Sequence, residues 1–277
     1  MTDSHPGRVR VAALFDDLAP RYDQGPVPWF RPIAARLVDL LDPQPGDRAL
    51  DVGAGRGAAT FPLAEAVGAT GRVVAVDLSP RMCDLLRTSV ADAGAAQVEV
   101  VVGEARPGTR GGSEFDVVAA SLVLFFDPEP AATLSDWMRL LRPGGRIGLT
   151  TFGPVDDAWT AAERRVLAHA PADMLDARTS GTRGVFGSPS AMAGLLEQCG
   201  AIEVGSHDEP LEVTLPDAGA WRAWTMTLGM RQIWDSIPPP RREEVFTAAA
   251  TELEGARGAD GRLHLTQQVR YTIGRAP

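Results

Sequence analysis

The stretch that decides the fold is RALDVGAGRGAAT, residues 48–60. It ends a short apolar run with Asp51 and Val52 and follows that run with Gly53, Gly55 and Gly57. An apolar strand, a glycine-rich turn and a helix form the ligand-binding unit of a doubly wound α/β sheet. The first glycine permits the tight turn, and the second lets a ligand approach the backbone closely. We therefore expect a ligand at this turn and a helix that begins near Gly57.

Further apolar segments on either side of this stretch complete a sheet. They are RVVAVD at 72–77, VEVVVG at 98–103, FDVVAAS at 115–121, RIGLTTF at 146–152, a segment near 201–205 that leads into LEVTLP, and HLTQQVRYTIG at 264–274. Helices separate most of the early segments, and buried strands that alternate with helices form a parallel sheet. The last segment alternates apolar and polar residues, as an antiparallel strand does. The sequence predicts a Rossmann-like, doubly wound α/β fold whose mostly parallel seven-stranded sheet has an antiparallel last strand.

Helix signals appear between and outside these strands. Residues 10–24 and the residues after Pro32 carry apolar side chains at helical spacing. Ser79-Pro80 and Ser188-Pro189 each resemble an N-cap followed by proline at the first helical position. We also expect Asp127, in the stretch DPEP, to cap the helix that follows.

Composition excludes several function classes. All 27 basic residues are arginine, so Schiff-base lysines, GK[ST] phosphate loops and Tyr-x-x-x-Lys sites are excluded. Asparagine is also absent, which leaves no N-glycosylation acceptor. A net charge of −9 disfavours a nucleic-acid partner. The apolar run 117–126 is too short to cross a membrane, and the first residues carry no apolar stretch typical of a secretory signal. Cys83 and Cys199 form no CxxC pair, which together with the lack of a signal favours the cytoplasm. The oligomeric state stays open.

The charge of Asp51 separates two kinds of nucleotide cofactor. Gly53, Gly55 and Ala58 satisfy the G-x-G-x-x-G/A dinucleotide pattern, and Asp77 lies where an acid accepts hydrogen bonds from ribose hydroxyls. A pyrophosphate would be repelled by Asp51, whereas a ligand with an ammonium group would be attracted. S-adenosylmethionine carries ribose hydroxyls and an ammonium group but no phosphate. The alternative is that Asp51 only caps the turn or the following helix.

The motifs DVGAGRG, VDLSP, GEA, FDVVAASLVLFF and LRPGG resemble, in this order, the class I S-adenosylmethionine-dependent methyltransferases, close to the ubiquinone/menaquinone C-methyltransferase branch. The resemblance spans residues 11–153. It implies that Asp51, Gly53, Ala54 and Gly55 hold the methionine end of the cofactor and that Asp77 binds the ribose. It further places Leu78 and Met82 against the adenine, Glu104 and Ala105 at its edge, Tyr22 over the cofactor and Ser121 beneath the methyl group.

With this resemblance, we divide the chain into six parts. They are an N-terminal helical lid segment (1–45), a cofactor-binding core (46–153), an insertion (154–187), a continuation of the core (188–216), a helical substrate lid (217–260) and a final core strand (261–277). The helical insertions are expected to form a lid over the acceptor.

An apolar chamber is the expected acceptor site, because methyl transfer depends on alignment and exclusion of water more than on a fixed base. Its candidate lining residues are Phe126, Trp159, Trp221, Trp224, Met226 and Met230. No catalytic base and no metal cluster is recognised. Related enzymes often have a histidine where this chain has Phe125-Phe126, and this departure weakens the case for quinone-ring C-methylation.

Three function hypotheses remain. The first is a methyltransferase that acts on a small, hydrophobic or aromatic metabolite, in which the methylated atom is oxygen, nitrogen or carbon. The second is a non-methylating enzyme, such as a cyclase, that keeps the cofactor on the same fold. The third is an NAD(P)-dependent oxidoreductase, which Asp51 and the absence of lysine oppose.

Overall fold

The computed structural model describes residues 5–25, 27–106, 114–170 and 182–277. Their strands form one seven-stranded sheet in the order β3-β2-β1-β4-β5-β7-β6. The strands are β1 (Arg48–Val52), β2 (Arg72–Asp77), β3 (Val98–Val102), β4 (Phe115–Ser121), β5 (Leu141–Val155), β6 (Ile202–Leu215) and β7 (Leu263–Arg275). The predicted number of strands and the doubly wound order are confirmed.

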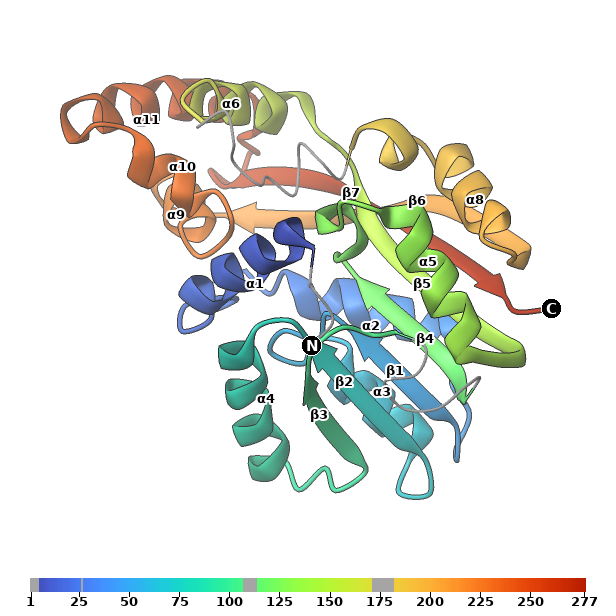
Figure 1. Cartoon of the computed structure of the whole chain (residues 1–277). Coiled ribbons are helices and arrows are strands. Elements are labelled where there is room, and N and C mark those ends of the chain that lie inside the picture. Colours follow the sequence, from blue (N-terminus) through green and yellow to red (C-terminus); the bar gives the residue numbers. More distant parts are fainter. Residues whose placement is uncertain (1–4, 26, 107–113, 171–181) are drawn as a thin grey trace.

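The first five strands pair in parallel, with β1 between β2 and β4. Strands β1, β2 and β4 are almost wholly buried, because helices cover both faces of this part of the sheet. These helices are α2 (Phe30–Leu41), α3 (Thr60–Val67), α4 (Pro80–Asp92) and α5 (Pro130–Leu140). In Figure 1 the carboxyl ends of β1, β2 and β4 point toward α1 (Pro6–Leu18), which lies across them.

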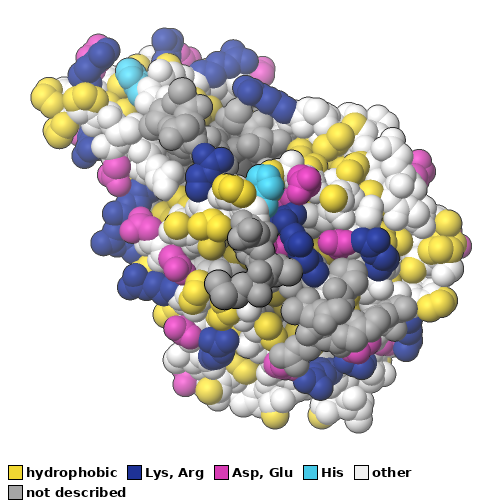
Figure 2. All heavy atoms as spheres, viewed as in Figure 1, with side chains coloured by type: hydrophobic (Ala, Val, Ile, Leu, Met, Phe, Trp, Pro, Cys, Tyr) yellow, Lys and Arg dark blue, Asp and Glu magenta, His cyan; other side chains and the backbone are white. Residues whose placement is uncertain are grey.

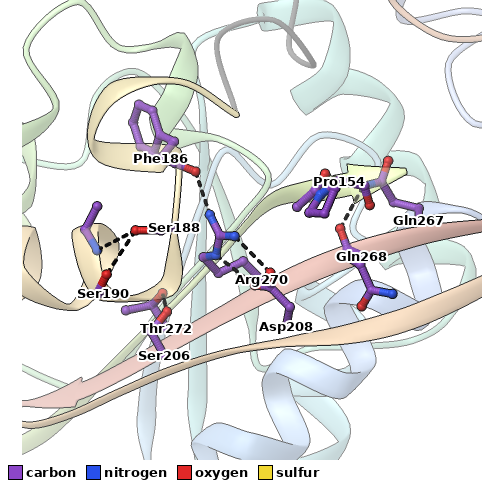
Figure 3. A network of polar contacts seen from close by, with 12 residues as sticks. Pro154, Phe186, Ser188, Ser190, Ser206, Asp208, Gln267, Gln268, Arg270 and Thr272 are labelled. Atoms are coloured by element: carbon purple, nitrogen blue, oxygen red, sulfur yellow. Dashed lines mark hydrogen bonds and ion pairs between the residues drawn. The ribbon is translucent and has the colours of Figure 1, made fainter. Parts of the chain in front are cut away.

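The last strand runs antiparallel between β5 and β6, as predicted. Strand β6 is one continuous strand through residues that the sequence suggested as two segments. Strand β5 begins at Leu141 and runs through the LRPGG motif, where its register against β4 shifts. Buried Arg270 of β7 donates to Asp208 of β6 and to the carbonyl of Phe186, which fastens η2 (Gly184–Phe186) to the sheet (Figure 3).

The remaining helices lie toward the other end of the sheet. They are α6 (Asp157–Leu167), α8 (Pro189–Gln198), α9 (Ala218–Thr225), α10 (Arg231–Ser236) and α11 (Pro239–Leu253), with the short turns η1 (Leu124–Phe126) and η3 (Glu254–Ala256). Helices α6 and α11 pack side by side (Figure 1). Residues 171–181 of the predicted insertion lie outside the described residues. In the described part of the chain, every helix is too short or too polar to cross a bilayer.

Two of the three predicted helix caps are confirmed. The hydroxyl of Ser79 accepts from the Met82 amide, and that of Ser188 accepts from the Ala191 amide. The prediction for Asp127 was wrong, because α5 begins at Pro130 after Glu129. Asp127 instead accepts from the Glu129 amide and pairs with Arg8 of α1, so a tertiary ion pair replaces the expected cap.

Candidate functional site

The glycine turn after β1 is shaped by close contacts and left-handed backbone. Gly53, Gly55 and Gly57 have φ of +67°, +53° and +94°. A Cβ on Gly53 would lie 2.4 Å from Cγ2 of Val123, whereas one on Gly55 would meet no atom closer than 4.0 Å. Gly53 is therefore needed for packing, and Gly55 leaves room for a ligand. Helix α3 begins at Thr60, three residues later than expected, because residues 55–59 form turns.

Asp51 lies under this turn and is only 1% exposed. Its Oδ2 accepts a 2.6 Å hydrogen bond from the hydroxyl of Thr60, the first residue of α3. Burial raises the pKa of the Asp51 carboxyl to about 7, and the bond from Thr60 opposes that rise. The carboxyl thus supports the start of α3 and also lines the adjoining cavity.

Asp77, at the end of β2, connects the two turns that flank the cavity. One of its carboxyl oxygens accepts from the Gly55 amide and the other from the Ser79 amide, each at 2.8 Å. Burial raises the pKa of Asp77, and the two amides oppose that rise. A carboxyl oriented in this way offers its remaining lone pairs to hydroxyl groups in the cavity.

The far end of the cavity carries a charged cluster. Glu104 pairs with Arg106, with 2.5 Å between Oε2 and Nε, and with Arg8 of α1 at 3.5 Å. Arg8 is 7% exposed and also donates to both carboxyl oxygens of Asp127 and to the hydroxyl of Thr133. These contacts fix α1 over the end of the cavity.

Tyr22 closes the cavity at its other end. Its ring stacks on Phe30 at 4.7 Å and meets Phe15 edge-on at 5.7 Å. Burial raises the pKa of Tyr22, with smaller contributions from Asp23 and Asp77, so the phenol stays protonated.

Together these residues line a cavity of about 400 Å³, here called the cofactor pocket. Its walls include every residue that the sequence singled out for the cofactor: Tyr22, Asp51, Gly53, Ala54, Gly55, Asp77, Leu78, Met82, Glu104, Ala105 and Ser121. The open space at Gly55, the acceptor at Asp77 and the carboxyl at Asp51 fit a ligand with an adenosine and an amino-acid end.

A second cavity of about 60 Å³, here called the apolar annex, adjoins the first. Among the described residues, five line both cavities: Phe15, Tyr22, Phe30, Leu122 and Phe126. The annex is completed by Leu14, Leu18, Trp29, Phe125, Phe152, Leu228, Gly229 and Met230.

The predicted acceptor residues divide between this annex and the core. Phe126 and Met230 line the annex. Trp159 and Trp221 are fully buried and line neither cavity, and Trp224 and Met226 also lie outside both walls. Trp159 packs on Trp29 with 5.9 Å between the rings, so it stands behind the annex wall.

Sequence reasoning missed Arg8, Phe30 and Leu122 as wall residues. Phe30 stands two residues before a proline, and Arg8 stands before the helical pattern that we recognised. Leu122 has a left-handed φ of +57°. Leucine rarely adopts this conformation, so no sequence pattern predicts it at this position.

Comparison with known proteins agrees with this geometry. Residues 49–145 match a family model described as a methyltransferase domain. The chain is 40% identical over 275 residues to the nocamycin O-methyltransferase of Saccharothrix syringae, a match that covers 95% of this chain and 97% of that protein. It is 32% identical over 169 residues to a demethylmenaquinone methyltransferase of Renibacterium salmoninarum, covering 57% and 67% of the two chains.

The fold is also that of a solved [4+2]-cyclase, SpnF, with a TM-score of 0.57, 17% identity and coverage of 98% and 97%. That likeness shows a shared fold. The full-length match to a methyltransferase identifies the reaction class, which sets aside the oxidoreductase hypothesis and favours methyl transfer over cyclisation. The chain belongs to the class I S-adenosylmethionine-dependent methyltransferases that act on small molecules.

Proposed function

We propose that this enzyme transfers the methyl group of S-adenosylmethionine to an oxygen atom of a small, apolar or aromatic metabolite of secondary metabolism. The observation that carries the proposal is the apolar annex, which is lined by aromatic and aliphatic side chains and shares five lining residues with the cofactor pocket. The choice of oxygen rests on the full-length similarity to an enzyme named as an O-methyltransferase.

In this proposal the cofactor is held by the residues that the sequence singled out. Asp51 faces its ammonium group, Gly53, Ala54 and Gly55 cradle the methionine end, and Asp77 accepts from the ribose hydroxyls. Leu78 and Met82 pack on the adenine, with Glu104 and Ala105 at its edge. Tyr22 covers the cofactor, and Ser121 lies beneath the methyl group. The support is that all of these side chains or backbones line one cavity.

Bound S-adenosylmethionine supplies a methyl group on a positively charged sulfur, ready for in-line displacement. The protein positions the acceptor and excludes water. The five shared wall residues orient an acceptor toward the cofactor and keep water from the reacting atoms. Tyr22, held neutral by burial, lines the annex with a side chain that can donate a hydrogen bond to an acceptor oxygen.

An annex of about 60 Å³ is far below the roughly 300 Å³ that a metabolite site needs. In this proposal, acceptor entry requires movement of α1 or of residues 228–230, both of which line the annex. This assigns the lid role to residues 1–45 and 217–260, around a core formed by 46–153, 188–216 and 261–277. Phe126 would touch the acceptor, while Trp159 and Trp221 would support the wall from behind.

The surface suits a small-molecule acceptor rather than nucleic acid or a membrane. On the face drawn in Figure 2, arginines are interspersed with acidic side chains, and the chain as a whole carries a charge of −9. The two cysteines are free thiols, which suits the reducing cytoplasm as the site of action.

The proposal is tested by incubating the enzyme with S-adenosylmethionine and a panel of fused-ring phenols, aromatic carboxylic acids, aromatic amines and enolisable diketones. We expect S-adenosylhomocysteine to form together with an O-methylated product, detected by mass spectrometry and assigned by NMR. Methylation at nitrogen or carbon alone would contradict the choice of oxygen. A product formed without consumption of the cofactor would instead support a cyclase.

A further inference from the structure

Leu122 has a backbone conformation that leucine rarely adopts. It follows the last residue of β4, is 6% exposed and has a φ of +57°. The other described non-glycine residues with positive φ are Asp23, Asp42 and Glu203, all acidic. A branched, buried side chain in this region is strained, and such strain persists where the surroundings impose it.

Thr150 of β5 holds the peptide group that precedes the Leu122 side chain. The Leu122 amide donates to Oγ1 of Thr150 at 2.9 Å and to the Thr150 carbonyl at 3.2 Å. Thr150 is 1% exposed, and its hydroxyl also lies 3.1 Å from the hydroxyl of Ser121. One buried hydroxyl therefore contacts both Ser121, the last residue of β4, and Leu122, the residue after it.

The next residue is fixed from the opposite side. Val123 packs so closely on Gly53 that a Cβ there would lie 2.4 Å from its Cγ2. The segment 121–123 is thus held between the glycine turn after β1 and the Thr150 hydroxyl. Because Thr150 holds the Leu122 amide and Val123 is packed against Gly53, a negative φ at Leu122 would break one of these two contacts.

Leu122 lines the cofactor pocket and the apolar annex, so its conformation shapes the wall between them. We propose that Thr150 is a positioning residue for methyl transfer: its hydroxyl holds Leu122 in the left-handed conformation and so sets the wall that the cofactor and the acceptor share. The expected effect of Thr150 on acceptor binding rests on the proposed function, whereas its expected effect on cofactor binding does not.

A double-mutant cycle read by calorimetric binding of S-adenosylmethionine tests the cofactor side. Thr150→Val keeps the shape but removes the hydroxyl, and we expect binding to weaken about tenfold, the usual effect of one lost buried hydrogen bond. Thr150→Ser should restore most of the affinity. In a Leu122→Gly background the left-handed conformation carries no strain, so Thr150→Val should have little further effect.

Equal weakening by Thr150→Val in both backgrounds, or unchanged affinity in the folded single variant, would overturn the proposal. The same double-mutant cycle in a Ser121→Ala background tests whether Thr150 acts through Leu122 or through Ser121. If Thr150→Val no longer weakens cofactor binding in that background, the hydroxyl acts through Ser121 instead, which would contradict the proposal. These measurements need no acceptor, so they stand apart from any failure of the proposed function.

If Thr150→Val does not fold, thermal unfolding of Leu122→Gly and Leu122→Ala decides. Alanine ordinarily gives the more stable protein, because glycine has more freedom in the unfolded chain. The strain at Leu122 requires the reverse order, and a more stable alanine variant would contradict it.

With an acceptor from the panel, Thr150→Val should lower kcat and raise the acceptor KM, and Thr150→Ser should restore both.

Discussion

The cofactor pocket and the apolar annex share five wall residues but are built from different kinds of segment. The pocket is built around residues at the carboxyl ends of β1, β2, β3 and β4, which a doubly wound sheet brings together, and α1 and Tyr22 also contribute to its lining. The annex is lined by aromatic and aliphatic residues from segments that include α1, η1, β5 and the loop after α9. The first and last of these segments are more than 200 residues apart in the sequence. A rule of fold topology thus places the first site, and only tertiary packing places the second.

The largest expected effect is at the turn where the two regions meet. Gly53→Ala would put a Cβ 2.4 Å from Val123 at a φ of +67°, so either the turn or the 121–123 segment must move. We expect binding of S-adenosylmethionine, measured by calorimetry, to weaken on the order of a hundredfold. Gly205→Ala on β6 is the matched control, since its Cβ would meet nothing within 4 Å. Equal affinities in both variants would mean that the turn does not shape the pocket.

A smaller effect on cofactor affinity is expected at Asp77, whose carboxyl holds two turns and, in our proposal, also binds the ligand. Asp77→Asn keeps the size but loses the charge that accepts from Gly55, Ser79 and, in our proposal, the ribose. Loss of charged hydrogen bonds predicts binding of S-adenosylmethionine about ten- to a hundredfold weaker. Asp84→Asn, exposed on α4 and paired with Arg87, is the control. S-adenosylhomocysteine, which has the same ribose, should be affected equally, and an effect confined to one ligand would argue against the ribose contact.

If Asp51 faces the ammonium group of the cofactor, as we propose, cofactor binding should depend on pH. Burial raises its pKa to about 7 in the free protein, and only the ionised carboxyl attracts an ammonium group. Affinity should therefore rise with pH up to about 7 and level off above, with a slope of up to about tenfold per unit below that value. Calorimetry between pH 5.5 and 8.5 tests this, together with Asp51→Asn, which should bind weakly and without this slope. A wild-type affinity that falls as pH rises toward 7 would rule out the contact.

The same raised pKa affects stability with the opposite sign. In the unfolded chain Asp51 ionises near pH 4, but in the fold it keeps its proton to about pH 7. The folded state therefore binds the extra proton between these values, and the contribution of Asp51 to stability falls as pH rises through this window. Denaturant unfolding of the cofactor-free protein should show this loss, and Asp51→Asn should remove it. A wild type and variant with the same pH dependence would show that Asp51 does not titrate there.

The contrast between the two regions also explains what sequence could predict. Asp51, Gly53 and Asp77 stand at strand ends, and their spacing is set by the lengths of β1, α3 and β2, so pattern alone located them. Trp159 and Trp221 are the kind of large apolar residue that lines an acceptor chamber, but both lie in the core. Helical spacing shows that one face of a helix is apolar, but it does not show which part of the protein packs against that face. Arg8 and Asp127 form an ion pair across 119 residues, and no local rule relates such positions.

The smallest effect separates the annex from the pocket directly. Met230 lines the annex alone, so Met230→Ala should leave the affinity for S-adenosylmethionine unchanged while the acceptor KM rises by about tenfold or less, the value of a few lost methylene contacts. Met226→Ala, partly buried outside both walls, is the matched control and should change neither quantity. Because both variants remove the same atoms, a rise in KM for Met230→Ala alone would place the acceptor against the loop after α9. If Met226→Ala has the larger effect, the acceptor enters on the other side of that loop and the annex is only a packing gap.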